Sequence, residues 1–399
     1  MSDASLHLGF FTDSYTPQVN GVAISMQLLV NSLRAKGHTV HIFAPRFRGW
    51  RDTDPHVHRL PSRRYMDNPP FDIALPVSPA IWRTIGRLKF DLLHMHTPLI
   101  LGGLAFGIAR RRHIPLIYTY HTAITDYVHY AGALARAPFT PRIARWFSGS
   151  TANLCDEIVV PSAKFQPLLR EHGVHRPIHV VPNGIDLEVF YQTPTQNTFR
   201  QTWNIPPDAP ILLSVGRLAP EKRLDFLIEA FSAVVRQQPQ ARLIFAGDGS
   251  ARAALEKQAA ASAYAARIVF LGMVERARLP ELFHTATVYV SASTTEVHPL
   301  SMIEAIASGL PVVAVRDEAL TEMVLEGVNG HFTPREAEPF SAAILHVLSD
   351  PSARHAYQHA SREISRRYSV EAQAETLLTL YRHALEEKSR TGTVAALPI

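Results

Sequence analysis

Two glutamates, Glu296 and Glu304, are the residues whose type and spacing most directly indicate chemistry. A strand-like apolar run at 286–290 precedes Glu296. A helical pattern begins at Leu300 and stops at Gly309, where glycine favours a helix end. The pattern therefore predicts Glu296 in a loop at the carboxyl end of a strand and Glu304 about one turn inside the next helix.

The start of this predicted helix is suited to bind an anion. Its first amides, Leu300 and Ser301, have no partners within the helix, and the helix dipole favours negative charge there. Carboxylates that bind hydroxyl groups, next to amides that bind phosphate, fit a ligand that carries both, such as a nucleotide sugar. The alternative is one loop glutamate and one exposed helical glutamate, which requires no ligand.

Along the whole chain, apolar strands alternate with amphipathic helices, which predicts an α/β fold with parallel sheets covered on both faces. The expected strands are 8–12, 39–44, 92–96, 116–121, 158–160 and 178–181, and then 211–215, 242–246, 268–271, 288–290 and 312–315. A polar, proline-rich stretch follows residue 190. We expect two Rossmann-like domains, 1–190 and 191–370. Residues 371–399 should form a C-terminal helix and a tail, and one option is that this helix crosses back to the first domain. Ligands of such sheets bind at the carboxyl ends of the strands, so two facing domains would form a cleft.

Two cations, Arg217 and Lys222, follow the first strand of the second half. Arginine offers a forked set of donors and lysine a point charge, and the combination suits a diphosphate. The alternative is a pair of solvated cations, with Lys222 bound to a nearby acid.

Three positions in the first half could contact a sugar or phosphate. Asn20 and Gly21 lie between the first strand and the first helix, where glycine lets the backbone approach a ligand closely. His121 ends the strand expected at 116–121, from where it could contact a sugar hydroxyl. The alternatives are an ordinary turn and a structural histidine.

A metal site is not expected. His94 and His96 lie on one face of a strand, but no third ligand with recognisable spacing accompanies them. An Asp-x-Asp pair that could hold a metal on the diphosphate is absent from the sequence. We therefore expect neither a metal nor a permanently bound cofactor.

The bulk composition, with 46% hydrophobic and 19% charged residues, is that of a globular protein. The single cysteine, Cys155, excludes an internal disulfide and favours a reducing compartment. The first residues lack the basic start of a signal peptide, and the longest apolar run is too short to span a bilayer. Residues 1–190 hold 20 Lys/Arg against 13 Asp/Glu, a net charge of +7, so this half could face an anionic partner.

Two segments of the basic half, 80–90 and 135–147, combine aromatic residues with arginines. Such segments can lie in the surface of an anionic membrane. The alternative is that they are ordinary helices packed on the sheet. Nucleic acid is not expected, because no recognisable nucleic-acid-binding module accompanies the charge.

The order of these motifs resembles the retaining glycosyltransferases of family 4, which have the GT-B fold. The resemblance spans nearly the whole chain and includes Asn20-Gly21-Val22, Tyr120-His121-Thr122, Val181-Pro182-Asn183-Gly184-Ile185-Asp186, Gly216-Arg217 with Glu221-Lys222, Gly247-Asp248-Gly249 and the Glu296-x7-Glu304 pair. It implies two Rossmann-like domains facing each other across a cleft, and a nucleotide-sugar donor.

The resemblance also assigns roles to residues. Arg217 and Lys222 should hold the diphosphate, Glu304 the ribose hydroxyls, and Glu296 the donor sugar, together with the amides of Leu300 and Ser301. Gly21, next to Asn20, should lie against the diphosphate and sugar, and His121 by the reactive face of the sugar. The family often has glycine in the turn after the first glutamate, where this chain has His298-Pro299, and proline removes one amide donor.

The opening motif at 11–22 and the segment at 126–130, which includes the candidate substrate-binding residue Asp126, are similar to a narrower branch that adds glucose or galactose to diacylglycerol. This implies a hexosyltransferase that uses a UDP-sugar as co-substrate, retains the anomeric configuration and acts on the 3-hydroxyl of diacylglycerol. It would be cytoplasmic and peripherally associated with the inner face of the cell membrane. The alternatives are another acceptor (phosphatidylinositol, a soluble thiol or a polysaccharide), a nucleotide-sugar epimerase, and a non-catalytic sugar-nucleotide binder.

Overall fold

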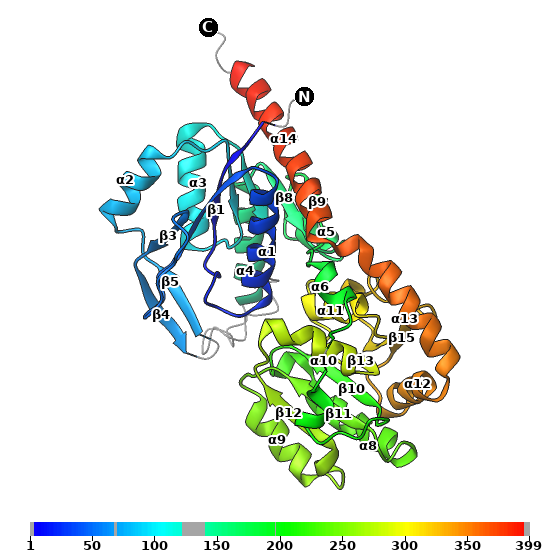
Figure 1. Cartoon of the computed structure of the whole chain (residues 1–399). Helices are drawn as coiled ribbons and strands as arrows, with labels where there is room; N and C mark the ends of the chain where they lie inside the picture. The colour runs from blue at the N-terminus through cyan, green and yellow to red at the C-terminus, as the bar shows by residue number, and fades with distance from the viewer. Residues whose placement is uncertain (1–3, 68–69, 122–139, 196, 395–399) are drawn as a thin grey trace. The chain divides into compact units, whose positions relative to one another are not determined.

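The computed structural model describes residues 4–67, 70–121, 140–195 and 197–394. The chain divides into two compact units (Figure 1). Unit 1 comprises Met1–Gly184 and Val370–Ile399, and unit 2 comprises Ile185–Ser369. The sequence-based limits lie after residues 190 and 370, with a return of the C-terminal helix to the first domain as one option. In the structure that segment belongs to unit 1.

Unit 1 contains a seven-stranded parallel sheet with the order β3-β2-β1-β6-β7-β8-β9. Its strands are β1 (His7–Phe11), β2 (Thr39–Pro45), β3 (Val57–Leu60), β6 (Leu92–Met95), β7 (Leu116–Thr119), β8 (Glu157–Val160) and β9 (Ile178–Val180). An antiparallel pair, β4 (Ser62–Asp67) and β5 (Pro70–Ala74), forms a separate two-stranded sheet.

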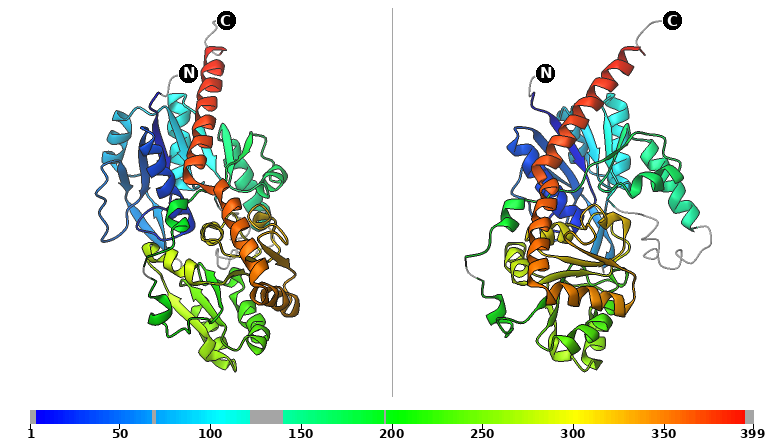
Figure 2. Two further views of the ribbon diagram at one scale, coloured as in Figure 1. Left: turned by 45° about the vertical axis from the view of Figure 1, so that its right-hand side comes forward. Right: turned by 90° about the vertical axis from the view of Figure 1, so that its right-hand side faces the viewer.

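The helices of unit 1 cover this sheet on both faces. They are α1 (Gly21–Ala35), α2 (Pro79–Arg87), α3 (Ile100–Arg112), α4 (Thr140–Asn153), α5 (Phe165–Glu171) and α14 (Val370–Val394). Connections between parallel strands are right-handed, and β2 and β7 lie in opposite directions from the centre, so α1 and α3 cover opposite faces. The apolar residues of α14 share one buried core with α1 and β1, and Figures 1 and 2 show α14 beside α1.

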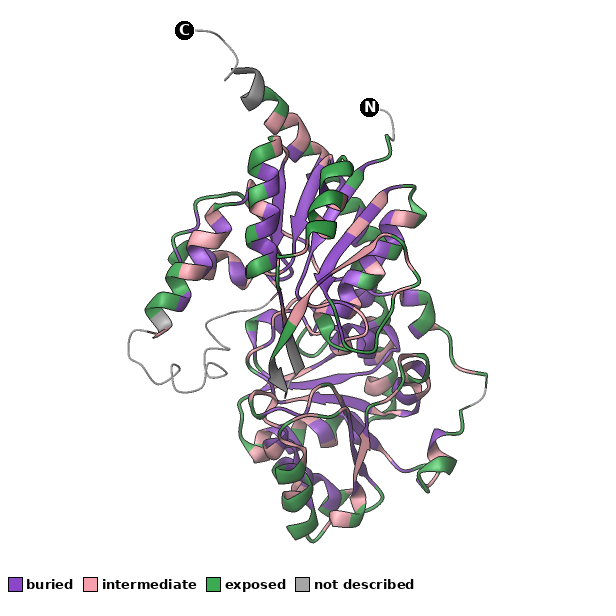
Figure 3. Ribbon diagram, turned by 90° about the vertical axis from the view of Figure 1, so that its left-hand side faces the viewer, coloured by how far each residue is buried: buried purple, intermediate pink, exposed green. Residues whose placement is uncertain are grey.

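Unit 2 contains a six-stranded parallel sheet with the order β12-β11-β10-β13-β14-β15. Its strands are β10 (Ile211–Val215), β11 (Arg242–Ala246), β12 (Ile268–Gly272), β13 (Val288–Ser291), β14 (Val312–Val315) and β15 (Gly330–Thr333). Its helices are α6 (Leu187–Tyr191), α7 (Phe199–Thr202), α8 (Leu224–Gln237), α9 (Arg252–Ala261), α10 (Leu279–Thr285), α11 (Leu300–Ala307), α12 (Ala337–Ser349) and α13 (Pro351–Ser365). The strands of both sheets are largely buried, whereas the helices turn exposed residues to solvent (Figure 3).

The strand order reverses next to the first strand of each unit. In unit 1 the chain runs from β1 outward through β2 and then returns to place β6 on the other side of β1. In unit 2 it runs from β10 outward through β11 and returns to place β13 on the other side of β10. At such a reversal the loops after the two central strands diverge and leave a crevice at the carboxyl edge, which is the usual ligand site of an open α/β sheet.

The strands expected from the sequence are confirmed, with ends that differ by one or two residues. The pattern missed β3, β4, β5 and β15. The strands β3 and β15 lie at sheet edges, where fewer side chains are fully buried, so an apolar pattern is not required there. The strands β4 and β5 form the separate pair. Among the described residues, no helix is both long and apolar enough to cross a membrane.

The contact between α14 and the sheet of unit 1 includes a buried hydrogen bond. The Tyr381 hydroxyl lies 2.6 Å from Nδ1 of His94, while His94 Nε2 lies 2.7 Å from the Thr119 hydroxyl. Both ring nitrogens of His94 are thus engaged within the protein, which gives this histidine a structural role.

Replacing Tyr381 with Phe removes the hydroxyl and leaves His94 Nδ1 buried without a partner. We expect the free energy of unfolding of unit 1 to fall by about 1–2 kcal/mol, measured by urea denaturation. Tyr264→Phe, in unit 2, is the control, since no described residue hydrogen-bonds its hydroxyl, and it should change the stability of its own unit by less than about 0.5 kcal/mol. Equal effects of the two variants would contradict this account of α14.

Candidate active site

The reversal in unit 2 places the loop after β10 next to the loop after β13, and these loops carry most of the predicted donor-site residues. Lys222, in a short 3₁₀ turn at Pro220–Lys222, lies with Nζ 2.6 Å from Oε1 of Glu296. Both side chains are mostly buried. The alternative in which Lys222 pairs with a nearby acid is therefore correct, but that acid is Glu296, so the pairing joins two candidate site residues.

Arg217 follows β10 directly, and its guanidinium donates to the Glu221 carboxylate at 2.5 Å. The side chain of Arg217 is about one third exposed (31%), whereas Glu221 is nearly buried. This pair holds the arginine at the carboxyl edge of the sheet, where about a third of its side chain is accessible.

Glycines in the loop after β11 allow the loop that carries Arg217 to pack closely against it. The Leu218 amide donates to the Asp248 carbonyl, and the Gly216 amide donates to the Ala246 carbonyl. A Cβ at Gly247, where φ is +140°, would lie 1.9 Å from the Gly216 carbonyl oxygen. Only glycine fits this approach, which explains the Gly247-Asp248-Gly249 motif structurally.

Glu304 is buried in α11, with a side chain only 4% exposed, and therefore is not the exposed helical glutamate of the alternative interpretation. Its Oε1 accepts from Arg276 Nη1 at 2.9 Å. Burial raises the pKa of Glu304, and the charge and hydrogen bond of Arg276 oppose that rise. No other hydrogen bond to its carboxylate is found in the described part of the chain, so Oε2 remains available to a ligand.

The start of α11 has the form that anion binding requires. Within the described residues, neither the Leu300 amide nor the Ser301 amide donates a hydrogen bond. The Tyr289 hydroxyl lies 3.2 Å from the Val215 carbonyl and 3.0 Å from the Ser301 hydroxyl. Tyr289 therefore fixes the first turn of α11 against the end of β10.

The turn between β13 and α11 carries further polar groups. Ser293 and Thr295 have buried hydroxyls that find no hydrogen-bond partner in the described chain. Pro299 caps α11 without a side-chain hydrogen bond. Burial lowers the pKa of His298 to about 3, so its imidazole is neutral at physiological pH.

In unit 1, Asn20 is a helix cap, because its side-chain oxygen accepts from the Ala23 amide at 3.0 Å. Gly21 begins α1, and a Cβ added there would meet no atom within 4 Å. His121 follows β7, and its Nε2 lies 2.9 Å from Nδ1 of His96. Burial lowers the pKa of His121 to about 4, so this histidine is neutral as well.

The structure thus gathers six predicted residues at one edge of unit 2 and places three in unit 1. The first group is Arg217, Lys222, Glu296, Leu300, Ser301 and Glu304; the second is Asn20, Gly21 and His121. Asp126 lies outside the described residues.

Sequence reasoning missed two residues of the unit 2 site, Arg276 and Asp317. Arg276 lies in the loop after β12 and binds Glu304, and Asp317 lies after β14, where its carboxylate is 3.3 Å from the Glu296 amide. Both residues follow the carboxyl ends of predicted strands, and this position is the signal by which the sequence could have indicated them as site residues. Among the described residues, no group of three or more His, Cys, Asp or Glu side chains is arranged to hold a metal ion.

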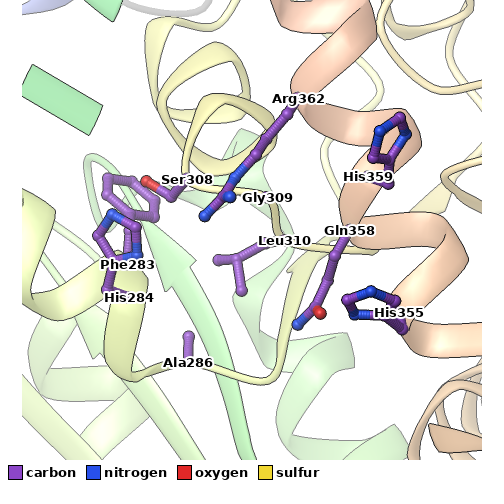
Figure 4. A pocket seen from close by; sticks show the side chains of 10 residues that line it. All are labelled: Phe283, His284, Ala286, Ser308, Gly309, Leu310, His355, Gln358, His359 and Arg362. Atoms are coloured by element: carbon purple, nitrogen blue, oxygen red, sulfur yellow. The ribbon is translucent and has the colours of Figure 1, made fainter. Parts of the chain in front are cut away.

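A separate hollow of about 210 Å³ lies in unit 2 between α10, α13 and the end of α11 (Figure 4). Leu310 lies at its centre in this view, and Arg362 points into it from α13. Gly309 and Leu310 precede β14, so this hollow lies at the amino edge of the sheet. It is therefore distinct from the edge that carries Arg217 and Glu296.

Comparison with known proteins is consistent with this arrangement. Residues 19–189 match Glycosyltransferase Family 4, and residues 195–364 match Glycosyl transferases group 1. The chain belongs to these glycosyltransferases. Membership of this family makes the protein an enzyme that transfers a sugar, as the order of its sequence motifs indicated.

Its relatives include two alpha-monoglucosyldiacylglycerol synthases. The one from Acholeplasma laidlawii is 28% identical over 96% of this chain and 99% of its own length. The one from Streptococcus pneumoniae is 30% identical over 86% of this chain and 78% of its own length. A GDP-mannose-dependent alpha-mannosyltransferase from Mycobacterium tuberculosis is 31% identical over 77% of this chain and 79% of its own length.

Solved structures confirm the expected GT-B fold, with two Rossmann-like domains. The sucrose-phosphate synthase of Thermosynechococcus elongatus aligns with a TM-score of 0.80 and 22% identity over 96% of this chain and 100% of its own. Anabaena HepE, in complex with UDP-glucose, aligns with a TM-score of 0.73 and 21% identity over 94% of this chain and 99% of its own.

Removing the Arg276 guanidinium by Arg276→Ala should leave Glu304 buried without a counter-charge. The folded-state pKa of Glu304 is already raised, so its contribution to stability is present at low pH and is lost as the pH rises through that pKa. We therefore expect Arg276→Ala to destabilise unit 2 by about 2 kcal/mol at pH 8, since Arg276 is partly exposed, and by much less at pH 4.

The control is Arg278→Ala, which removes a half-exposed arginine that lies two residues after Arg276 and pairs with Glu281. It should change stability by less than about 1 kcal/mol. Thermal unfolding of both variants across this pH range measures the difference. A loss for Arg276→Ala that does not depend on pH would contradict the assigned pair.

Proposed function

We propose that this glycosyltransferase transfers a hexose, glucose or galactose, from a UDP-sugar to the 3-hydroxyl of 1,2-diacylglycerol, with retention of the anomeric configuration. The observation that carries the proposal is the similarity to the Acholeplasma relative along nearly the full length of both chains. That relative is named for a monoglucosyl diacylglycerol product.

The carboxyl edge of unit 2 supports a role in binding the donor. We assign the diphosphate to Arg217, Lys222 and the start of α11, because the two cations offer positive charge and the Leu300 and Ser301 amides offer unused donors. We assign hydroxyl groups of the donor to the carboxylates of Glu296 and Glu304. Arg276 and Lys222 hold these carboxylates in place, and that limits the reorganisation needed when the donor binds.

The proposed reaction is a front-face transfer. The acceptor oxygen forms its bond to the anomeric carbon on the side from which the diphosphate leaves, and the diphosphate takes both the electron pair of the broken bond and the proton of the hydroxyl. Cations and amides stabilise the charge that grows on the diphosphate, which is electrostatic catalysis. His121 is neutral and so does not oppose the positive charge that develops on the sugar.

Two exposed tryptophans of unit 1 support a lipid acceptor. Trp82 on α2 and Trp146 on α4 are 48% and 68% exposed, and Arg83 and Arg145 are their chain neighbours. Among the described residues of these helices, the buried apolar ones are Ile85 of α2 and Ala144 and Ala152 of α4. The Trp82 indole donates to the Pro76 carbonyl at 3.0 Å, but much of both tryptophans stays exposed, which supports contact with an anionic bilayer surface.

A second donor is favoured by the mannosyltransferase relative, which is named as GDP-mannose-dependent and is 31% identical. The same edge of unit 2 would hold the diphosphate of either nucleotide sugar. The acceptor alternatives, phosphatidylinositol, a soluble thiol or a polysaccharide, share the transfer step. An epimerase would differ, because it would convert the sugar nucleotide without an acceptor.

The proposal is tested by incubating the pure protein with diacylglycerol vesicles and, in separate reactions, UDP-glucose, UDP-galactose or GDP-mannose. Mass spectrometry of the lipid and NMR of the anomeric proton should identify one α-hexosyl diacylglycerol, made from a UDP-sugar. Transfer from GDP-mannose would select the second donor, and turnover of the donor in the absence of vesicles would indicate the epimerase.

In this assay, Arg217→Ala should lower kcat by about 100-fold, by analogy with the loss of an oxyanion-hole donor, which raises a barrier by about 3 kcal/mol. Arg236→Ala, at an exposed position near the end of α8, is the matched loss of one positive charge in the same unit and should leave kcat unchanged. Similar turnover in the two variants would exclude Arg217 from phosphate binding.

Replacing Trp82 and Trp146 together with Ser should weaken binding to anionic vesicles by about 10-fold per tryptophan, because each loses apolar area that enters the interface. Vesicle flotation measures the effect. Trp203→Ser removes an exposed tryptophan from unit 2 and should not change flotation. The proposed surface would be wrong if the double variant floated like the parent protein.

A further inference from the structure

The loop after β1 contains a buried carboxylate that none of the assigned roles uses. Asp13 is 1% exposed. Its Oδ2 accepts from the Thr97 hydroxyl at 2.7 Å, and its own amide donates to the same Thr97 oxygen at 3.0 Å. Its Oδ1 is buried and has no hydrogen-bond partner in the described chain.

A buried carboxylate normally has a cation or several donors, because removing its charge from water is expensive. Asp13 forms no ion pair with any described residue. Burial consequently raises its pKa to about 6, and the hydrogen bond from Thr97 only partly opposes the rise. The fold thus keeps a carboxylate in an unfavourable setting, with one oxygen fixed and the other unused.

A second unused polar atom lies in the neighbouring loop. His96 follows β6 and is 3% exposed, and its amide donates to the Phe11 carbonyl at 2.8 Å. Its Nδ1 is paired with His121, but its Nε2 has no partner among the described residues. His96 and Thr97 are neighbours in the chain. Since Thr97 binds Asp13 and His96 binds His121, this short segment links the two residues.

The position of this cluster in the sheet is the one where a ligand is expected. Asp13 follows β1 and Thr97 follows β6, and these two strands pair directly at Phe11 and Met95. The strand order of unit 1 reverses between them, so their loops border the crevice at its carboxyl edge. Two buried polar atoms without partners at this point are groups that a bound molecule would satisfy.

We propose that Asp13 binds the hydroxyl group of the sugar acceptor, with the acceptor O–H donating to Oδ1. Thr97 is the positioning residue that fixes the carboxylate. The inference rests on the proposed function, because it requires that the acceptor is an alcohol. It goes further by naming Asp13 as the residue that orients that alcohol for attack. The proton still leaves with the diphosphate, so Asp13 supplies alignment of the nucleophile and not a new chemical step.

The test compares Asp13→Asn with the parent protein in transfer to diacylglycerol vesicles and in UDP binding by calorimetry. The amide keeps the size of the side chain but loses the charged acceptor. We expect kcat/KM for the acceptor to fall by about 100-fold, the loss typical of a misaligned nucleophile, while the dissociation constant of UDP changes less than twofold. Thr97→Val should raise the acceptor KM and leave UDP binding intact.

Asp72→Asn is the matched control. Asp72 is also a buried carboxylate of unit 1 with one oxygen bound, to Arg64, and the other without a partner, but it lies in β5, away from the crevice. It should leave kcat/KM for the acceptor within twofold. An equal loss in the two variants, or a loss of UDP affinity that matches the loss of turnover in Asp13→Asn, would overturn the proposal.

Stability separates this role from a purely structural one. The titratable groups of the adjoining loop and strand, His96 and His121, have pKa values lowered by burial and are neutral. Because the folded-state pKa of Asp13 is raised, its ionisation destabilises the fold as the pH rises through about 6. Asp13→Asn should therefore unfold at the same or a higher temperature than the parent at pH 8, and a clear decrease would identify Asp13 as structural and overturn the proposal.

The acceptor and the role of Asp13 can fail separately. If the parent protein glycosylates another alcohol and not diacylglycerol, the proposed acceptor is wrong, and the variants are compared with that alcohol. If the parent glycosylates diacylglycerol and Asp13→Asn does so equally well, the proposed function stands and the role of Asp13 is wrong.

Discussion

The reversal of strand order beside the first strand of each sheet is the constraint on which the rest of the structure depends. In unit 2 it separates the loops after β10 and β13, and in unit 1 the loops after β1 and β6. Parallel strands leave their carboxyl ends at one edge, so residues far apart in the sequence meet there. Lys222 and Glu296, which are joined at 2.6 Å, are the clearest example.

The carboxylates at these edges differ in how their charge is balanced. Glu296 has Lys222 and Glu304 has Arg276, and each pair leaves one acid held in place for hydroxyl groups. Asp13 has only a neutral hydroxyl, from Thr97. Glu296 and Glu304, with their cations, suit a donor that carries a negative diphosphate, because positive charge is already present beside them. Asp13, which has no cation, suits a neutral alcohol.

The sequence predicted the fold class and most of the unit 2 site because both depend on local patterns. The apolar run at 286–290 and the stop at Gly309 were sufficient to place Glu296 in a loop and Glu304 in a helix, and both placements are confirmed. Edge strands such as β3 and β15 gave no signal, because several of their side chains are only partly buried. Arg276 and Asp13 were not found, because their meaning depends on partners from other loops, Glu304 in one case and Thr97 in the other.

The central claim is that the carboxyl edge of unit 2 holds the diphosphate of a nucleotide sugar. A crystal structure of the protein with UDP tests it most directly. The account predicts density for the β-phosphate within hydrogen-bond distance of the Leu300 and Ser301 amides and of Arg217, with the ribose hydroxyls at Glu304. Density for UDP elsewhere, for example in the hollow beside Arg362 at the opposite edge of the sheet, would contradict it.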